Sequence, residues 1–367
     1  TKRFTTLDPS ATWEPSDFTI QLAKVGAGMF QAGGPPQPSW LTNPGGASGS
    51  PTVTWSTMTN DLGLNPNDVS CPSARLCVFA GTLEPSRPGV EIPAVAISTG
   101  PFTPHGDLVG TTTSFPQNSD YGGLAYVACA SPTMCVLSTI DGIYAASDPT
   151  SAHWTMEAPH GGGQVSCPTV SFCAVAAGSG VYVSGAPLGG PSAWAYTQLG
   201  TPGLGAIACP TAKLCVAGGS DGLTVGGWIE TSTDPLAASS WHGGKTTWPP
   251  YAQHSGQYSV GGISCPTTAF CIAAVAAGAP LVSTNPAGGI RTWTQVANNT
   301  NGEDNPGFAQ CASSGHCTVS GIGSFEAGSG GAGPGIAGYP LPGVSCVSTA
   351  FCVTTTDNEL AVGQAAP

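Results

Sequence analysis

The sequence predicts an all-β fold, a seven-bladed β-propeller with four-stranded blades, and three observations support this. Fourteen cysteines fall into seven pairs, and each pair encloses five residues. The first cysteines of successive pairs are 58, 38, 42, 56, 46 and 35 residues apart, and a period near this mean of about 46 is typical of propeller blades. Similar apolar segments flank every pair. The pairs are Cys71 with Cys77, Cys129 with Cys135, Cys167 with Cys173, Cys209 with Cys215, Cys265 with Cys271, Cys311 with Cys317 and Cys346 with Cys352.

Few of the 367 residues are charged, and turn-forming residues are frequent. Charged residues make up 8% of the chain, against about 25% in typical domains. The 53 glycines and 34 prolines suit the many turns of a β-rich fold. The net charge of −12 argues against nucleic acid or an anionic membrane surface as a partner. No apolar stretch reaches the length of about 18 residues that predicts a transmembrane segment.

The matched cysteine pairs indicate disulfides rather than zinc sites. A zinc site needs four ligands that meet at one point, and pairs spread around a ring do not meet. We therefore expect one disulfide in every blade and a secreted protein, extracellular or at the cell surface. The chain opens without the segments of a signal peptide, so we expect the numbering to start after a removed signal.

Strands A and B of each blade lie on either side of the cysteine pair. In the third repeat, strand A is predicted to end at Cys167, the turn to cover residues 168–171 and strand B to begin at about Phe172. Cysteines that flank such a hairpin loop face each other on paired strands, close to disulfide distance. Because each closed loop is short, each disulfide is expected to stabilise the fold by about 2 kcal/mol.

Strand C is predicted at residues 142–146, 180–184 and 280–283, and a polar turn and a tryptophan follow it. The turns are Ser147-Asp148-Pro149 before Trp154, Ser232-Thr233-Asp234-Pro235 before Trp241 and Ser283-Thr284-Asn285-Pro286 before Trp293, with a weaker case from Ser184 to Trp194. This pattern resembles the Asp-box, S-x-D-x-G-x-x-W, of the sialidase-like (BNR-type) propellers. The resemblance implies that the turns join strands C and D and are folding elements. Their polar side chains are expected to cap the turns, and the tryptophans to fill the gaps between blades.

The resemblance does not extend to the sialidase active site. Those enzymes hold a carboxylate with three arginines and use a Tyr/Glu nucleophile pair. This chain has only Arg3, Arg75, Arg87 and Arg291. Arg75 falls in a predicted A–B turn and Arg291 in a predicted C–D turn, so we expect no sialidase activity.

The two ends of the repeat predict how the ring closes. The seventh repeat has a strand C at residues 359–362 but no strand D, whereas residues 51–56 form a predicted strand D ahead of the first repeat. The N-terminal strand is therefore expected to complete the last blade, which removes exposed sheet edges. Residues 51–367 are the predicted propeller, and residues 1–50 are an N-terminal extension, a lid or linker.

The candidate site is on the face formed by the B–C loops and the D-to-A connections, because loops from all the blades converge there. Long loops are predicted at residues 81–93, 105–123, 241–258 and 298–304. Carboxylates, amides and aromatic rings suit sugar hydroxyls and ring faces, and paired carboxylates suit acid–base or nucleophilic work on a glycosidic bond. The candidate catalytic residues are Asp120, Tyr121, His254, Tyr258, Glu303 and Asp304. The candidate ligand-binding residues are Asp68, Asp141, His160, Asp221, Trp248 and Tyr251.

Three functions remain open at this point. The first is the binding of a polysaccharide or another cell-surface ligand, and the second is its cleavage by a glycoside hydrolase or lyase. The third is a structural role through self-assembly at a cell surface or in a filament. The six histidines show no metal-ligand spacing, and no cofactor is expected, although the loop carboxylates would suit calcium.

Overall fold

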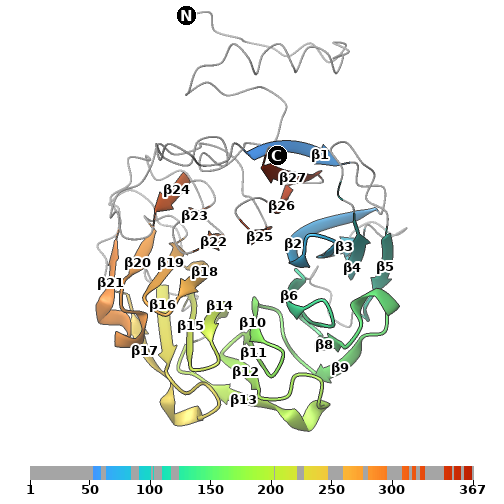
Figure 1. Cartoon of the computed structure of the whole chain (residues 1–367). Coiled ribbons are helices and arrows are strands. Elements are labelled where there is room, and N and C mark those ends of the chain that lie inside the picture. Colours follow the sequence, from blue (N-terminus) through green and yellow to red (C-terminus); the bar gives the residue numbers. More distant parts are fainter. Residues whose placement is uncertain are drawn as a thin grey trace, which may run out of the picture. The chain divides into compact units, whose positions relative to one another are not determined.

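The computed structural model describes a series of segments between Val53 and Ala365, which build seven antiparallel sheets. Six of these sheets have four strands and one has three among the described residues. The predicted β-propeller is confirmed (Figure 1). The described residues are 53–58, 63–83, 91–100, 102, 110–116, 124–201, 203–220, 227–246, 259–275, 280–295, 308–313, 316–319, 323–326, 343–348, 351–356 and 359–365.

Blades are numbered by their cysteine pairs, and strands A to D follow one another along the chain. Blade 1 has β2 (Leu64–Ser73), β3 (Leu76–Leu83), β4 (Ile92–Thr99) and β5 (Gly110–Ser114). Blade 2 has β6 (Tyr126–Ser131), β7 (Met134–Thr139), β8 (Gly142–Ala146), the 3-10 helix η1 (Pro149–Ser151) and β9 (Thr155–Ala158). Blade 3 has β10 (Val165–Thr169), β11 (Phe172–Ala177), β12 (Gly180–Ser184), η2 (Pro191–Ala193) and β13 (Trp194–Gln198).

The remaining blades follow the same plan. Blade 4 has β14 (Leu204–Thr211), β15 (Leu214–Ser220), β16 (Gly227–Ser232), η3 (Ala238–Ser240) and β17 (His242–Lys245). Blade 5 has β18 (Val260–Thr267), β19 (Phe270–Val275), β20 (Leu281–Ser283), η4 (Pro286–Gly288), η5 (Ile290–Thr292) and β21 (Trp293–Gln295). Blade 6 has β22 (Ala309–Ser313), β23 (His316–Val319) and β24 (Gly323–Glu326). Blade 7 has β25 (Gly343–Ser348), β26 (Phe351–Thr356), β27 (Glu359–Ala365) and, from the N-terminal side, β1 (Val53–Met58).

The A strands of the blades form a closed ring. Each contacts the next, from β2 through β6, β10, β14, β18 and β22 to β25, and β25 contacts β2 again (Figure 1). The last sheet has the order β1-β27-β26-β25, with Val53 opposite Ala365 and Met58 opposite Leu360. The predicted closure by an N-terminal strand is therefore confirmed. The predicted extension, residues 1–50, lies outside the described residues.

Five of the seven predicted disulfides are confirmed directly, in blades 1 to 5. Their Cα–Cα distances are 3.9–4.2 Å, close to the spacing of directly paired strand residues. These disulfides join Cys71 to Cys77, Cys129 to Cys135, Cys167 to Cys173, Cys209 to Cys215 and Cys265 to Cys271.

The last two cysteine pairs have the same register. In blade 6, Cys311 lies opposite Cys317 and is disulfide-bonded. In blade 7, Cys346 lies opposite Cys352. The bond predicted between Cys346 and Cys352 stays a prediction, because their side chains lie outside the described part of the structure.

The predicted end of strand A at the first cysteine is wrong. In blade 3, β10 continues through a bulge to Thr169, because its pairing with strand B resumes beyond the disulfide, where Thr169 lies opposite Phe172. The turn between the two strands is therefore shorter than the predicted residues 168–171.

Three predicted loops partly consist of strands. β5 lies inside the predicted loop 105–123, and β17 inside the predicted loop 241–258. The strands β3 and β4 also extend into the predicted loop 81–93. The connections between strands are therefore shorter than the sequence suggested.

Polar side chains cap the C–D turns, as predicted. Asp148 precedes η1, and its carboxylate accepts hydrogen bonds from the N–H and the hydroxyl of Thr150 at 3.0 and 2.6 Å. In blade 4, the Ser232 hydroxyl accepts a hydrogen bond from the Asp234 N–H at 3.1 Å. These local bonds satisfy backbone donors in the turns, which is a structural role.

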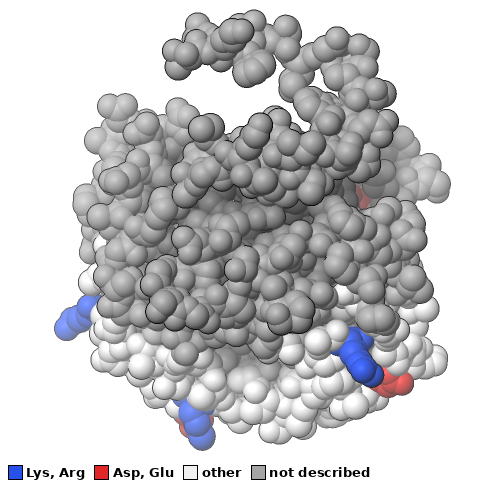
Figure 2. Space-filling model, turned by 45° about the horizontal axis from the view of Figure 1, so that its top comes forward, with Lys and Arg blue, Asp and Glu red and all other residues white. Residues whose placement is uncertain are grey.

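Charged side chains are sparse on the surface. On the face shown in Figure 2, few Lys, Arg, Asp and Glu side chains lie among the uncharged residues that the structure describes. Lys213 and Asp234 form an exposed ion pair at 3.8 Å on blade 4, and exposed pairs of this kind contribute about 0–1 kcal/mol. The stability of the described blades therefore depends mainly on packing, disulfides and hydrogen bonds.

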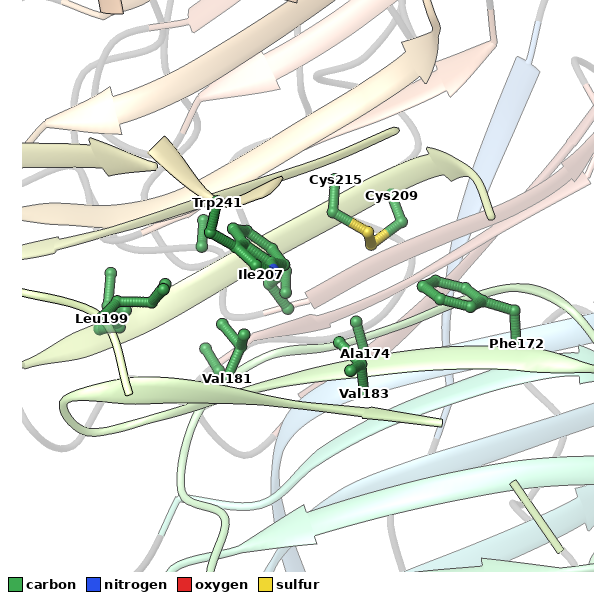
Figure 3. Close-up of a cluster of buried hydrophobic side chains, with 12 residues drawn as sticks. Phe172, Ala174, Val181, Val183, Leu199, Ile207, Cys209, Cys215 and Trp241 are labelled. Carbon is green, nitrogen blue, oxygen red and sulfur yellow. A yellow bond between two sulfur atoms is a disulfide. The ribbon is translucent and has the colours of Figure 1, made fainter. Parts of the chain in front are cut away.

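Apolar clusters fill the gaps between neighbouring blades. Figure 3 shows the cluster that joins Phe172 and Val181 of blade 3 to Ile207 and Trp241 of blade 4. The buried indole of Trp241 donates a hydrogen bond from Nε1 to the Pro235 carbonyl at 3.2 Å. Three other gaps also hold a tryptophan packed between blades, and the predicted role of these side chains is confirmed. These are Trp154, Trp194 and Trp293.

Candidate functional site

Strand A is an inner edge of its sheet, so alternate backbone N–H groups face the centre of the ring. The residue before the first cysteine pairs with strand B, as Ser70 does with Val78 and Ser166 with Ala174. The next residue, the cysteine itself, turns its N–H away from strand B. Such an edge donor needs a hydrogen-bond acceptor wherever water does not reach it.

A serine of the preceding blade supplies this acceptor at four joints between blades. The serine stands directly before the first cysteine of its own blade, and its Oγ accepts a 2.9 Å hydrogen bond from the first cysteine N–H of the next blade. The bond from the Cys71 N–H to Ser345 connects blade 1 with blade 7, so the joint that closes the ring is bonded at the inner strands as well. The four bonds join Ser70 to Cys129, Ser166 to Cys209, Ser264 to Cys311 and Ser345 to Cys71.

Two residues before the bridging serines Ser70 and Ser166, the longer side chains of Asp68 and Gln164 also accept hydrogen bonds from the next blade. Asp68 Oδ2 accepts a hydrogen bond from the Val127 N–H at 2.8 Å, and Gln164 Oε1 accepts one from the Ile207 N–H at 3.3 Å. Gln164 Oε1 also accepts from the Ile263 N–H of blade 5 at 3.5 Å. The joint between blades 3 and 4 therefore has two bridging side chains. The joint between blades 1 and 2 has three, because the Asn67 amide also donates to the Ala125 carbonyl at 2.6 Å and accepts from the Ala125 N–H at 3.3 Å.

These bridging side chains line a cavity of about 280 Å³ at the centre of the ring, to which strand A of every blade contributes. Besides four serines, the residues that line it include Asp68, Gln164, Gln310 and Phe308. No lysine or arginine belongs to the described wall. The cavity therefore offers neutral hydrogen-bond donors and acceptors and a single carboxyl group.

Asp68 is the ionisable group of this wall. Burial raises its pKa from 3.8 to about 7, although the hydrogen bonds from the N–H groups of Val127 and Val69 act in the opposite direction. The neighbouring Tyr126 has its pKa raised to about 12, first by burial and then by the charge of Asp68. Near neutral pH the cavity therefore exchanges between a neutral and a singly negative state.

Two further carboxyl groups are buried away from the cavity. Glu157 is 2% exposed, its Oε2 has no hydrogen-bond partner among the described residues, and burial raises its pKa. Glu230 is 6% exposed and accepts a hydrogen bond from the Thr201 hydroxyl at 2.9 Å. Burial raises the pKa of Glu230, while that bond and the nearby His242 lower it. The two carboxyl groups belong to different blades, on β9 and β16, and do not form a pair.

The structure describes three of the predicted catalytic and ligand-binding residues, and only one lines the cavity. Asp68 forms part of the wall, whereas Asp141 lies in the turn between β7 and β8 and His160 is exposed between β9 and β10. Neither Asp141 nor His160 lines the cavity. The other candidates lie outside the described residues and stay predictions. These are Asp120, Tyr121, Asp221, Trp248, Tyr251, His254, Tyr258, Glu303 and Asp304.

Sequence reasoning missed the bridging serines and Gln164. The available signal was the residue before the first cysteine, which is serine in repeats 1, 3, 5 and 7 and alanine or glutamine in repeats 2, 4 and 6. Gln164 stands at the position of Asp68 in its own repeat, three residues before the cysteine. The bridging role of both positions could not be read from the sequence, because it depends on which backbone N–H groups of the next blade have no partner in their own sheet.

The described segments contain neither a group of metal-binding side chains nor a membrane-spanning helix. No three His, Cys, Asp or Glu side chains gather there as they would around a metal ion. No helix in these segments has the length and apolar character needed to cross a membrane.

Comparisons with known proteins add little to this description. No family model matches the chain, and no curated protein does. Among solved structures, one described as "YCF48 bound to D1 peptide" matches with a TM-score of 0.41 and 11% sequence identity, over 85% of this chain and 95% of that chain. The propeller architecture therefore follows from the sheets themselves, and the function has to be argued from the site.

Proposed function

We propose that the protein is an extracellular propeller that binds a neutral polysaccharide through the centre of its ring. The chemistry of the cavity wall carries the proposal. Sugar hydroxyls need donors and acceptors side by side, and the wall presents serine hydroxyls, the amides of Gln164 and Gln310, and one carboxyl group. Phe308 is also among the lining residues, and aromatic rings are the kind of surface on which a sugar ring packs.

The electrostatics favour a neutral ligand over an anionic one. An anion would be held by arginine or lysine, and the described wall has neither. The net charge of the chain is −12, and Asp68 adds negative charge inside the cavity above neutral pH. Both oppose the approach of acidic glycans.

The disulfides favour a site of action outside the cytoplasm. Five complete disulfides and the bonded Cys311 lie in successive blades. Such bonds form and persist in oxidising compartments. A secreted or cell-surface protein would meet polysaccharides there.

A panel of soluble polysaccharides tests the proposal. The oxidised protein is titrated with neutral α-glucan, β-glucan, xylan, mannan and galactan, and with pectin and hyaluronan as anionic contrasts. Binding and released sugar ends are measured in the same wells. We expect binding to at least one neutral polymer, no release of ends, and no binding to the anionic polymers.

The other outcomes of this panel contradict the proposal in different ways. Release of ends that is lost in Asp120→Asn or Glu303→Gln would make the protein a glycoside hydrolase or lyase with its site in the loops. Preference for the anionic polymers would overturn the electrostatic argument from the wall. Failure of every polymer to bind would reject polysaccharide as the ligand, and sedimentation would then test self-assembly.

A further inference from the structure

Among blades 1 to 5, the serine bridge is present at two of the four joints and missing at the other two. The position occupied by Ser70, Ser166 and Ser264 in blades 1, 3 and 5 is Ala128 in blade 2 and Ala208 in blade 4. The register is the same in all five blades, since each of these residues pairs with the residue eight positions later. The alanines therefore stand where a serine hydroxyl would otherwise accept the bond.

The cysteines opposite these alanines keep a free donor. Cys167 and Cys265 follow Ser166 and Ser264, which pair with strand B, so their N–H groups are directed away from strand B like that of Cys129. No hydrogen bond across the joint reaches either N–H within the described part of the chain. Both cysteines line the cavity, as do the two alanines.

The Gln164 amide adds a third donor. The side chain is 8% exposed, and its Oε1 accepts hydrogen bonds from Ile207 and Ile263. Its Nε2 donates to no atom of the described residues, and the side chain lines the same cavity. An amide nitrogen that faces a cavity without a protein acceptor is available to donate to water or to a ligand there.

We propose that the cavity holds a single sugar unit at the end of a polysaccharide chain, bound by the N–H groups of Cys167 and Cys265 and by Nε2 of Gln164. This inference rests on the proposed function and specifies its ligand. Oxygens of the sugar accept from these three donors, and one of its hydroxyl groups donates to Asp68. The volume of about 280 Å³ lies at the lower end of ligand pockets, which start at about 300 Å³, so it takes one ring and not a run of rings.

The missing serines supply the test. In a double variant, Ala128→Ser with Ala208→Ser, each new hydroxyl takes the place that Ser70 has opposite Cys129 and accepts the free N–H. We expect the affinity for the best polymer of the panel to fall about tenfold for each donor removed, while the melting temperature stays the same or rises. The control is Ala74→Ser, at an exposed turn position, which should change neither. Unchanged affinity in the folded double variant would overturn the proposal.

A length series tests end recognition without any variant. The best polymer of the panel is shortened by partial hydrolysis, and each fraction competes with the parent at equal mass. Binding at a chain end predicts that competition rises with the number of ends. If competition follows mass alone, the end-binding inference fails while the proposed function stands. If no polymer binds in the first place, the proposed function itself has failed.

Discussion

The hydroxyl of Ser70 in blade 1 accepts a 2.9 Å hydrogen bond from the backbone N–H of Cys129 in blade 2. The bond links a disulfide-bonded cysteine of one blade to the neighbouring blade. Cys129 lies opposite Cys135 in the register, and the bond to Ser70 shows that its N–H is directed away from its own sheet and toward the preceding blade. One position in the sequence therefore fixes the hairpin through its sulfur and the joint between blades through its backbone.

The bridging serines are expected to stabilise the ring individually. Ser166→Ala removes the acceptor for the Cys209 N–H and should lower the free energy of unfolding by about 1 kcal/mol. Denaturant titration followed by intrinsic fluorescence measures the change. Ser192→Ala, at an exposed position of η2, is the matched control and should have no effect. Equal midpoints for the two variants would contradict the role of the bridge.

Asp68 makes the stability depend on pH. Its pKa is about 7 in the folded protein and 3.8 as an unperturbed carboxyl, so the folded state binds the proton more tightly than the unfolded state. The contribution of Asp68 to the free energy of unfolding is therefore greatest below about pH 4, and it is lost as the pH rises through 7. Asp68→Asn removes the titrating charge but leaves one of the N–H groups of Val69 and Val127 without its acceptor at every pH. The variant should therefore be less stable than the natural protein at pH 4, and the difference should shift in its favour by about 2–4 kcal/mol between pH 4 and pH 8.

Thermal unfolding between pH 4 and 8 measures this difference. Asp234→Asn, at the exposed ion pair with Lys213, serves as the control and should retain the pH dependence of the natural protein. A parallel pH profile for Asp68→Asn and Asp234→Asn would show that Asp68 titrates like an exposed group. The burial argument for the cavity would then fail as well.

Trp241 is expected to be the costliest single truncation between blades 3 and 4. It packs in the cluster with Phe172 and Ile207 (Figure 3), so Trp241→Ala leaves a large cavity and should cost about 3–5 kcal/mol. Trp241→Phe keeps most of the packing and loses the hydrogen bond to Pro235, and a smaller loss is expected. Denaturant unfolding compares the two, and a loss in Trp241→Ala no larger than in Trp241→Phe would argue against a packing role.

The disulfides were predictable from the sequence because their geometry is local. Two cysteines on either side of a short hairpin, such as Cys209 and Cys215, meet whatever the rest of the ring does. The closing strand was also predictable, since the last repeat lacked a strand D and the segment before the first repeat supplied one. Both conclusions needed only the order of strands within a blade.

Strand D of blade 1 and the cavity were harder to foresee. Blades 2, 3, 4, 5 and 7 have a tryptophan in or directly before strand D. By contrast, β5 of blade 1 is Gly110–Ser114 and leads into Phe115, which packs on Tyr144 and Trp154 at 4.7 and 5.9 Å between ring centroids. The cavity depends on contacts between residues of different blades, such as Gln164 with Ile263. Sequence spacing does not reveal which inner side chains meet across the ring.

The closing strand leads to a prediction about the two N-terminal boundaries. Removal of residues 1–50 leaves β1 paired with β27, and we expect the unfolding midpoint to stay unchanged because the predicted propeller begins at residue 51. Removal of residues 1–58 deletes β1 and leaves the edge of β27 unpaired. An unpaired edge recruits other chains, so the second truncation should unfold at a lower temperature and associate on a sizing column. If both truncations behave alike, β1 is not the strand that secures the ring, and the stability of blade 7 depends on its three remaining strands and on the bond between Ser345 and Cys71.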